Sequence, residues 1–117
     1  MLLMYTIIAT LVFVLLPDVV LAWGPGMHMF VGITALTKLT LISPVIRALI
    51  EKHPDEFLYG AVVPDVVVGK KYAGYMHHCH NWDIGRLILS EAKTAGQRAS
   101  AYGYLTHLAA DVVAHNY

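Results

Sequence analysis

Apolar side chains recur every three or four residues along much of the chain, the spacing of one face of an α-helix. The first such stretch runs from Met27 to Ile42, with threonines and a lysine mostly between the apolar positions. Ser43-Pro44 follows and supplies an N-cap and a first-turn proline for a second helix, which should stop at His53-Pro54. The pattern therefore predicts two consecutive helices after the N-terminal segment.

The same pattern continues to the end of the chain. Asp55 is expected to cap a short helix over residues 56–62, which ends before Pro64. Residues 64–82 hold prolines, glycines and clustered histidines and are expected to form a long functional loop. Asp83 should cap a helix over residues 84–92, and a last helix should run from Gln97 to about His115. No strand alternation or internal repeat is visible, so the predicted fold class is all-α.

Residues 1–22 form an apolar stretch that ends in Val20-Leu21-Ala22. Small side chains at its last and third-last positions suit signal peptidase, so we expect a signal peptide that is removed after Ala22, and a secreted or periplasmic protein. An uncleaved N-terminal membrane anchor is the alternative, because no Lys or Arg precedes the apolar run. In the first case the mature chain starts at Trp23.

Composition narrows the chemistry. The 117 residues carry 8 basic and 8 acidic side chains, so the formal net charge is zero. That balance argues against a phosphate-binding groove built from bulk positive charge. Histidine is over-represented, with 7 residues against a single cysteine. Cys79 has no disulfide partner in the chain, so we expect so small a domain to be held by packing, by bound metal or by residues missing from this sequence.

The last helix carries the most specific pattern. His107, Asp111 and His115 are spaced by four residues, which places them along one stripe of a helix. Imidazole and carboxylate are usual zinc ligands, and the apolar neighbours predict a buried helix in which ionisable groups need a counter-charge. Ordinary helix-surface pairing is the alternative reading of the three residues.

Three other sequence elements are weaker evidence for a metal site when each is taken alone. In an extended segment His78 and His80 would point one way and His77 and Cys79 the other, so one pair could reach a metal site, and a solvated loop with a free thiol is the alternative. His28 alone is typical of a helix end. Asp65 alone is typical of a turn.

Together these elements resemble the zinc-dependent phospholipase C family, including the N-terminal domain of glycosylphosphatidylinositol-specific phospholipase D, and more distantly the zinc-dependent single-strand nucleases. The resemblance covers residues 23–117. Its carriers are Trp23-Gly24 with His28, the stretch from Tyr59 to Asp65, His80-Asn81-Trp82, and above all the stretch from Gly103 to His115.

The resemblance implies a multi-helix domain with a trinuclear zinc site. Trp23 would bind one zinc through its free α-amine and carbonyl, together with His28, and Asp111 would bridge that ion to a second zinc on His80 and His107. His115 would be a ligand of a third zinc. Asp65 would correspond to the general base near a metal-activated water that attacks phosphorus, and His78 is the less favoured substitute for His80.

The resemblance also predicts that the chain is the N-terminal part of a longer domain, because the remaining ligands of the third zinc would lie beyond Tyr117. We therefore expect a secreted zinc-dependent phosphodiesterase that hydrolyses phospholipids at a membrane surface, with two to three Zn²⁺ ions in a complete site. A single-strand nuclease, with nucleic acid as substrate, and a non-catalytic metal-binding or membrane-anchored fragment are the alternatives. No protein partner is inferred.

Overall fold

The computed structural model describes residues 1, 4–5, 7, 24–69, 72–74 and 77–115. Trp23 and almost all of the expected signal peptide lie outside the described residues. The main elements are the helices α3 (Pro25–Leu36), α4 (Pro44–Lys52), α5 (Pro54–Val66), α6 (Trp82–Glu91) and α7 (Ala95–His115), and a 3-10 turn, η1 (Leu39–Leu41). The described residues form helices and no strands, which confirms the all-α prediction. None of the helices within them is both long and apolar enough to cross a membrane.

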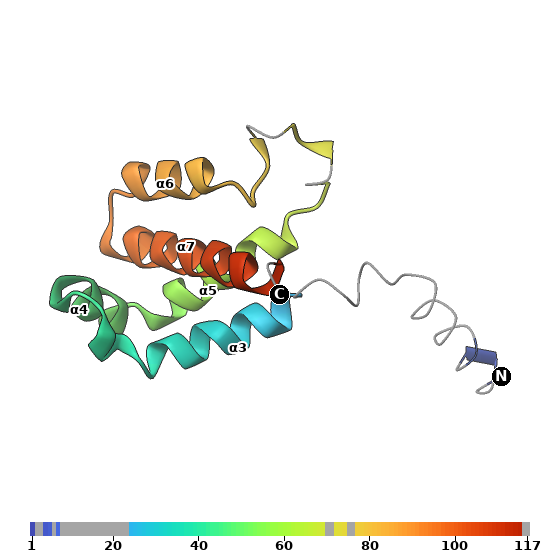
Figure 1. Ribbon diagram of the computed structural model, residues 1–117, viewed down its shortest axis with the longest axis horizontal. Helices are drawn as coiled ribbons and strands as arrows, with labels where there is room; N and C mark the ends of the chain where they lie inside the picture. Colours follow the sequence, from blue (N-terminus) through green and yellow to red (C-terminus); the bar gives the residue numbers. More distant parts are fainter. Residues whose placement is uncertain (2–3, 6, 8–23, 70–71, 75–76, 116–117) are drawn as a thin grey trace.

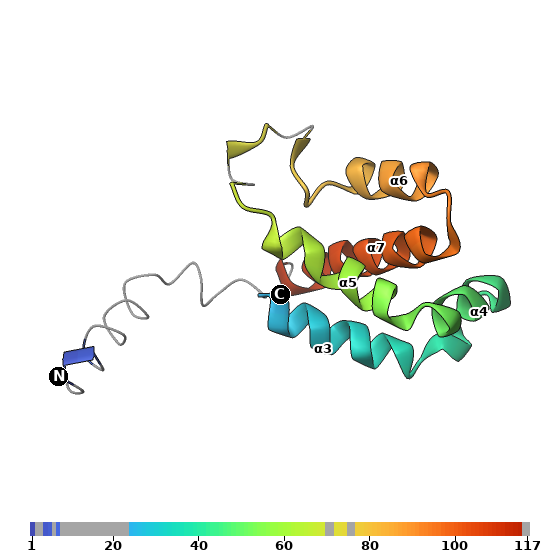
Figure 2. The same ribbon diagram turned by 180° about the vertical axis from the view of Figure 1, so that it is seen from behind.

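Helix α7 is the centre of the fold. It packs against α5 and α3 on one side and against α6 on the other, and α4 closes the end where α7 begins (Figure 1). Figure 2 shows from behind that the start of α3, the end of α5 and the end of α7 meet at the opposite end of the bundle. Segments far apart in the sequence therefore come together at that end.

Two glycines let α5 and α7 approach backbone to backbone. A Cβ atom on Gly60 would overlap the carbonyl oxygen of Ser100, and a Cβ atom on Gly103 would overlap that of Phe57. Both glycines are buried, and Phe57 belongs to the apolar core with Leu39 and Ile50. A side chain at either position would force the two helices apart, because interiors are too densely packed to absorb it.

The first predicted helix is shorter than its apolar pattern indicated. Helix α3 ends at Leu36 rather than Ile42, and η1 follows it. The Thr37 hydroxyl donates to the carbonyl oxygen of Thr34 at 2.7 Å, and the Lys38 N–H bonds the carbonyl of Ala35. Such local bonds compete with the helical pattern and stop it. The predicted end of α4 before His53 is confirmed.

The prediction that the third helix ends before Pro64 was wrong. Helix α5 continues through Pro64 to Val66, and Pro64 is buried. A proline this close to a helix end removes only one hydrogen bond, a loss that packing against α3 and α7 offsets. Asp65 therefore lies on the last turn of a helix and not in a loop.

The predicted caps also differ from those observed. Pro54 occupies the first turn of α5, after His53 at the N-cap, so Asp55 is inside the helix. For α6 the cap is Asn81, whose side-chain oxygen accepts from the Asp83 N–H at 2.9 Å. Helix α7 begins two residues earlier than predicted, because Thr94 and Gln97 form a reciprocal capping box.

Candidate metal centre

Five ionisable side chains converge where α3, α5 and α7 meet. His28 comes from the first turn of α3, Asp65 from the last turn of α5, and His107 and Asp111 from the second half of α7. His80 reaches the same point from the segment just before α6. The structure thus brings together five of the seven residues named from the sequence.

Asp111 contacts all three imidazoles. Its Oδ1 lies 3.1 Å from His28 Nε2, and its Oδ2 lies 3.4 Å from both His80 Nε2 and His107 Nε2. One carboxylate therefore faces ligands on both of its oxygens, the arrangement of a bridging group.

Asp65 faces the same imidazoles from the other side. Its Oδ1 lies 3.3 Å from His80 Nε2 and 3.9 Å from His107 Nε2, and its Oδ2 lies 3.7 Å from His28 Nε2. Within these five residues, two groups have ligand atoms close enough to share an ion: His28 with His107 and Asp111, and Asp65 with His80 and His107; a third such group is His78 with Cys79 and His80. Because His107 belongs to both of the first two groups, those two possible sites adjoin.

His107 is oriented by the neighbouring helix. Its ring is buried, and its Nδ1 lies 2.9 Å from the carbonyl oxygen of Ala61 on α5. A carbonyl oxygen only accepts, so Nδ1 carries the proton and the neutral ring presents the Nε2 lone pair to the two aspartates. Metal-binding histidines commonly donate their other ring N–H in this way.

His28 stacks on His107, with ring centroids 3.6 Å apart and planes inclined by 22°. Burial lowers the pKa of His28 below 6.5, and the proximity of His107 lowers it further, whereas Asp111 and Asp65 act in the opposite direction. The neutral, metal-binding form of His28 is favoured by this balance.

Residues 79 and 80 lie in a turn, so the segment is not extended as the predicted alternation of side chains assumed. The His80 N–H donates to His78 Nδ1 at 3.2 Å, and the Cys79 sulfur lies 3.4 Å from His80 Nδ1. The structure places His80 Nε2, and not His78, among the aspartates. The Tyr104 hydroxyl donates to the Cys79 carbonyl, and burial first and Cys79 second raise the pKa of Tyr104 to about 12, so it keeps its proton.

A pocket of about 400 Å³ opens beside the five residues. It is lined by His80, Trp82, Leu108, Asp111, Val112 and His115. His115 thus lines the same pocket as Asp111. Among the described residues, it belongs to none of the groups whose ligand atoms could share an ion. Trp23 lies outside the described residues.

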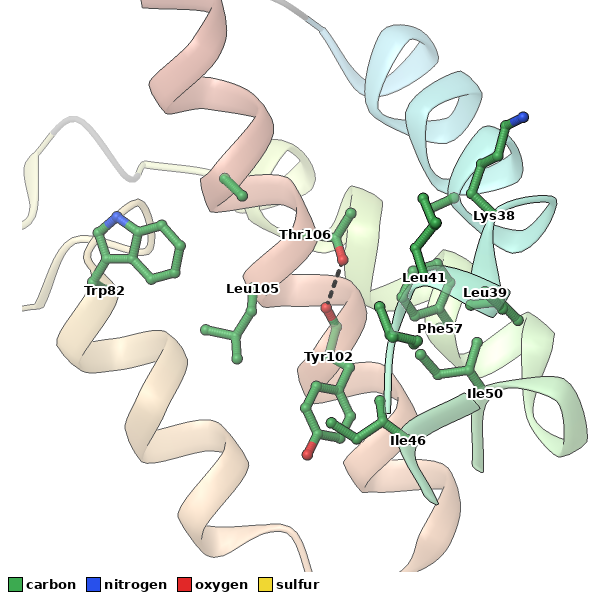
Figure 3. A pocket seen from close by; sticks show the side chains of 13 residues that line it. Lys38, Leu39, Leu41, Ile46, Ile50, Phe57, Trp82, Tyr102, Leu105 and Thr106 are labelled. Atoms are coloured by element: carbon green, nitrogen blue, oxygen red, sulfur yellow. Dashed lines mark hydrogen bonds between the residues drawn. The ribbon is translucent and has the colours of Figure 1, made fainter. Parts of the chain in front are cut away.

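Trp82 also lines a second, larger pocket of about 460 Å³, which is almost wholly apolar (Figure 3). In the figure Leu105, Tyr102 and Thr106 of α7 separate Trp82 from Leu39, Ile46 and Ile50. Pocket volumes of this size are typical of small-molecule sites. Of the five residues of the candidate centre, His80 and Asp111 line the smaller pocket, and none lines the larger one.

A family model described as zinc-dependent phospholipase C matches residues 27–117. The chain belongs to the zinc-dependent phospholipase C family. No curated protein and no solved structure matches it.

The residues of this phospholipase C family member fit zinc. Three imidazole nitrogens and two carboxylates are the ligand types that zinc prefers, whereas calcium and magnesium favour oxygen alone. The His107 Nε2 lone pair and the two aspartates are all electron-rich, and they face one another at 3.4 and 3.9 Å. A cation among them offsets the repulsion of buried groups of this kind.

Two supporting groups of this family member were not predicted from the sequence. The Ala61 carbonyl is a backbone atom and leaves no signal in the sequence. Tyr104 precedes His107 by three residues, so it lies on a neighbouring face of the same helix and could have been suspected as a partner of the histidine loop.

Proposed function

We propose that this protein is a zinc-dependent phosphodiesterase that hydrolyses phospholipids, in the manner of a phospholipase C. The observation that carries the proposal is the convergence of three imidazole Nε2 atoms on the carboxylates of Asp65 and Asp111, with distances of 3.1 to 3.9 Å. Family membership supports hydrolysis as the general activity.

Charge explains why cations are needed. The protein has no net charge, and the described residues lining the smaller pocket include an aspartate but neither lysine nor arginine. An anionic phosphodiester would be repelled by Asp65 and Asp111 unless positive charge were bound between them.

His28, His80, His107 and Asp111 are the residues that would hold two zinc ions, and His115 would contribute to a third. Zinc ions bound there would neutralise the phosphodiester and lower the pKa of the attacking water. Asp65 would accept a proton at Oδ1 or Oδ2, and the Ala61 carbonyl would keep the proton of His107 on Nδ1, away from the reacting groups.

The composition of the protein surface favours phospholipid over nucleic acid as the substrate. A neutral chain offers few phosphate contacts along a polynucleotide. Several large apolar side chains are instead exposed: Phe30, Ile33, Leu41, Val45 and Val68. Leu41 and Val45 are 82% and 80% exposed, as suits a protein that works against a lipid surface.

We further propose that the protein is exported and that residues 1–22 are removed. Cleavage would free the α-amine of Trp23, four residues before Met27, where the match to the family begins, and place it near His28. Intact mass spectrometry of the exported protein tests this directly, since retention of residues 1–22 would leave no free Trp23 amine.

The decisive assay supplies zinc-loaded protein at pH 7 with phosphatidylcholine vesicles, and in parallel with single-stranded DNA. We expect release of the phosphorylated head group, reduced about 100-fold or more in Asp111→Ala, because even residues behind a metal ligand cost 10–100-fold. His77→Ala removes an exposed imidazole and serves as the matched control. Cleavage of DNA alone would indicate a nuclease, and activity that survives Asp111→Ala would refute the mechanism.

A further inference from the structure

A short hydrogen-bonded chain lies behind His80, on the side away from the aspartates. The Cys79 thiol donates to the Pro64 carbonyl oxygen at 3.4 Å, and its sulfur lies 3.4 Å from His80 Nδ1. Cys79 and His80 are both half-buried, and Pro64 is buried. The cysteine therefore connects the histidine to the residue that precedes Asp65.

The contacts of Cys79 favour one position for the ring proton of His80. A carbonyl oxygen only accepts, so the contact with Pro64 assigns the single thiol hydrogen to that carbonyl. With the hydrogen there, the sulfur accepts from His80, and the imidazole proton is on Nδ1. The Nε2 atom of the neutral His80 ring is left with its lone pair, 3.3 Å from Asp65 and 3.4 Å from Asp111.

The opposite tautomer of His80, with the proton on Nε2, would gain hydrogen bonds when no cation is bound. With the proton on Nε2, His80 would donate to Asp65, to Asp111 or to His107 Nε2, which lies 3.0 Å away. That form could not bind a metal through Nε2. A group on the Nδ1 side is needed to favour the form that can.

We propose that Cys79 is a positioning residue that holds His80 in the Nδ1–H tautomer and aims its Nε2 lone pair at the candidate metal centre. The inference rests on the proposed zinc function. The segment is held from two sides, because the Cys79 thiol bonds to α5 and the Cys79 carbonyl accepts from Tyr104 of α7. Cys79 thus couples the place of His80 to that of Asp65.

The first test needs no substitution. Long-range ¹H–¹⁵N spectra of the zinc-free protein at neutral pH report which ring nitrogen of each histidine carries the proton. We expect the ring proton of His80 on Nδ1, as for His107. A spectrum that shows His80 mainly protonated on Nε2 would overturn the proposal, whatever the protein's enzymatic activity.

The second test compares Cys79→Ala with Cys79→Ser. Alanine removes the acceptor and should shift His80 toward Nε2–H and weaken zinc binding, measured by competition with a chromogenic chelator, by about 10-fold. Serine keeps a hydrogen-bond donor and acceptor, so Cys79→Ser should retain most of the Nδ1–H form of His80 and most of the zinc affinity. Ser90→Ala deletes an exposed hydroxyl bond to Leu87 and is the matched control.

Thermal unfolding of each variant separates positioning from folding. A folded Cys79→Ala protein with the wild-type tautomer and a zinc affinity within twofold of wild type would refute the role. If that variant does not fold, the wild-type spectrum and Cys79→Ser still decide it. Both readouts are independent of turnover, so loss of the proposed phosphodiesterase activity would leave them interpretable.

Discussion

The Nδ1 atom of His107 on α7 lies 2.9 Å from the carbonyl oxygen of Ala61 on α5. This bond crosses between two helices, and it forms because Gly60 and Gly103 allow their backbones to touch. The orientation of the His107 ring is therefore set by the packing of α7 against α5 as well as by α7 itself.

Gly103→Ala should separate the two helices and move His107 away from Ala61. The added methyl group would overlap the Phe57 carbonyl oxygen, so we expect a loss of about 1–3 kcal/mol in the free energy of unfolding, and weaker zinc binding. Urea denaturation measures the first quantity. Gly26→Ala, whose added methyl group would contact nothing within 4 Å, should change stability little and is the control.

Zinc should stabilise the protein through His107. Ligand at 100 times its dissociation constant adds about 2.7 kcal/mol to the free energy of unfolding, so a chelator should lower the thermal midpoint and added zinc should restore it. In His107→Ala this response should be nearly lost, whereas His77→Ala should keep it. An equal zinc response in both variants would argue against the site.

Asp65→Asn distinguishes a base from a ligand. Asparagine keeps an oxygen but takes up no proton at neutral pH. If Asp65 accepts the proton, the variant should bind zinc within a fewfold of wild type and lose activity by about 10²–10⁴-fold. Loss of zinc binding in parallel with activity would show that Asp65 is mainly a ligand. Isothermal titration with zinc and the vesicle assay together give the answer.

Tyr104→Phe should loosen the segment of residues 77–80. The hydroxyl bond to the Cys79 carbonyl would be lost, and we expect a destabilisation of about 0.5–1.5 kcal/mol. Amide hydrogen exchange should rise at residues 77–80 more than in α7. Tyr59→Phe, at an exposed tyrosine, provides the comparison, and equal exchange in the two variants would contradict the role of Tyr104.

The lowered pKa of His28 predicts a pH dependence of the zinc-free protein. Below pH 6.5 the unfolded chain binds a proton that folded His28 resists, chiefly because the ring is buried and close to His107. Stability should therefore fall as the pH drops through 6.5 toward the folded pKa, and His28 should contribute no dependence above that window. Urea unfolding at pH 7.5 and 5.5 should show a smaller decrease in His28→Gln than in wild type, and equal decreases would be the contrary result.

Much of the helical fold follows from local patterns. The start of α4 at Pro44 and its stop before His53 coincide with Pro44 and Pro54, whose effects act within a few residues, whereas the Ser43 side chain makes no capping hydrogen bond. The prediction failed at Pro64, because the rule that proline ends a helix ignores packing against α3 and α7.

In the candidate centre, the four-residue spacing of His107 and Asp111 was enough to place them on one helix face, since four residues make about one turn. The resemblance of other segments to family motifs pointed to His28, Asp65 and His80. That these five side chains meet, and that His80 rather than His78 faces the aspartates, depends on the packing of the helices. The same packing places Ala61 behind the ring of His107 and Cys79 behind that of His80. Helix periodicity is local, whereas those contacts depend on how closely α5 and α7 approach and on how the turn before α6 folds against them.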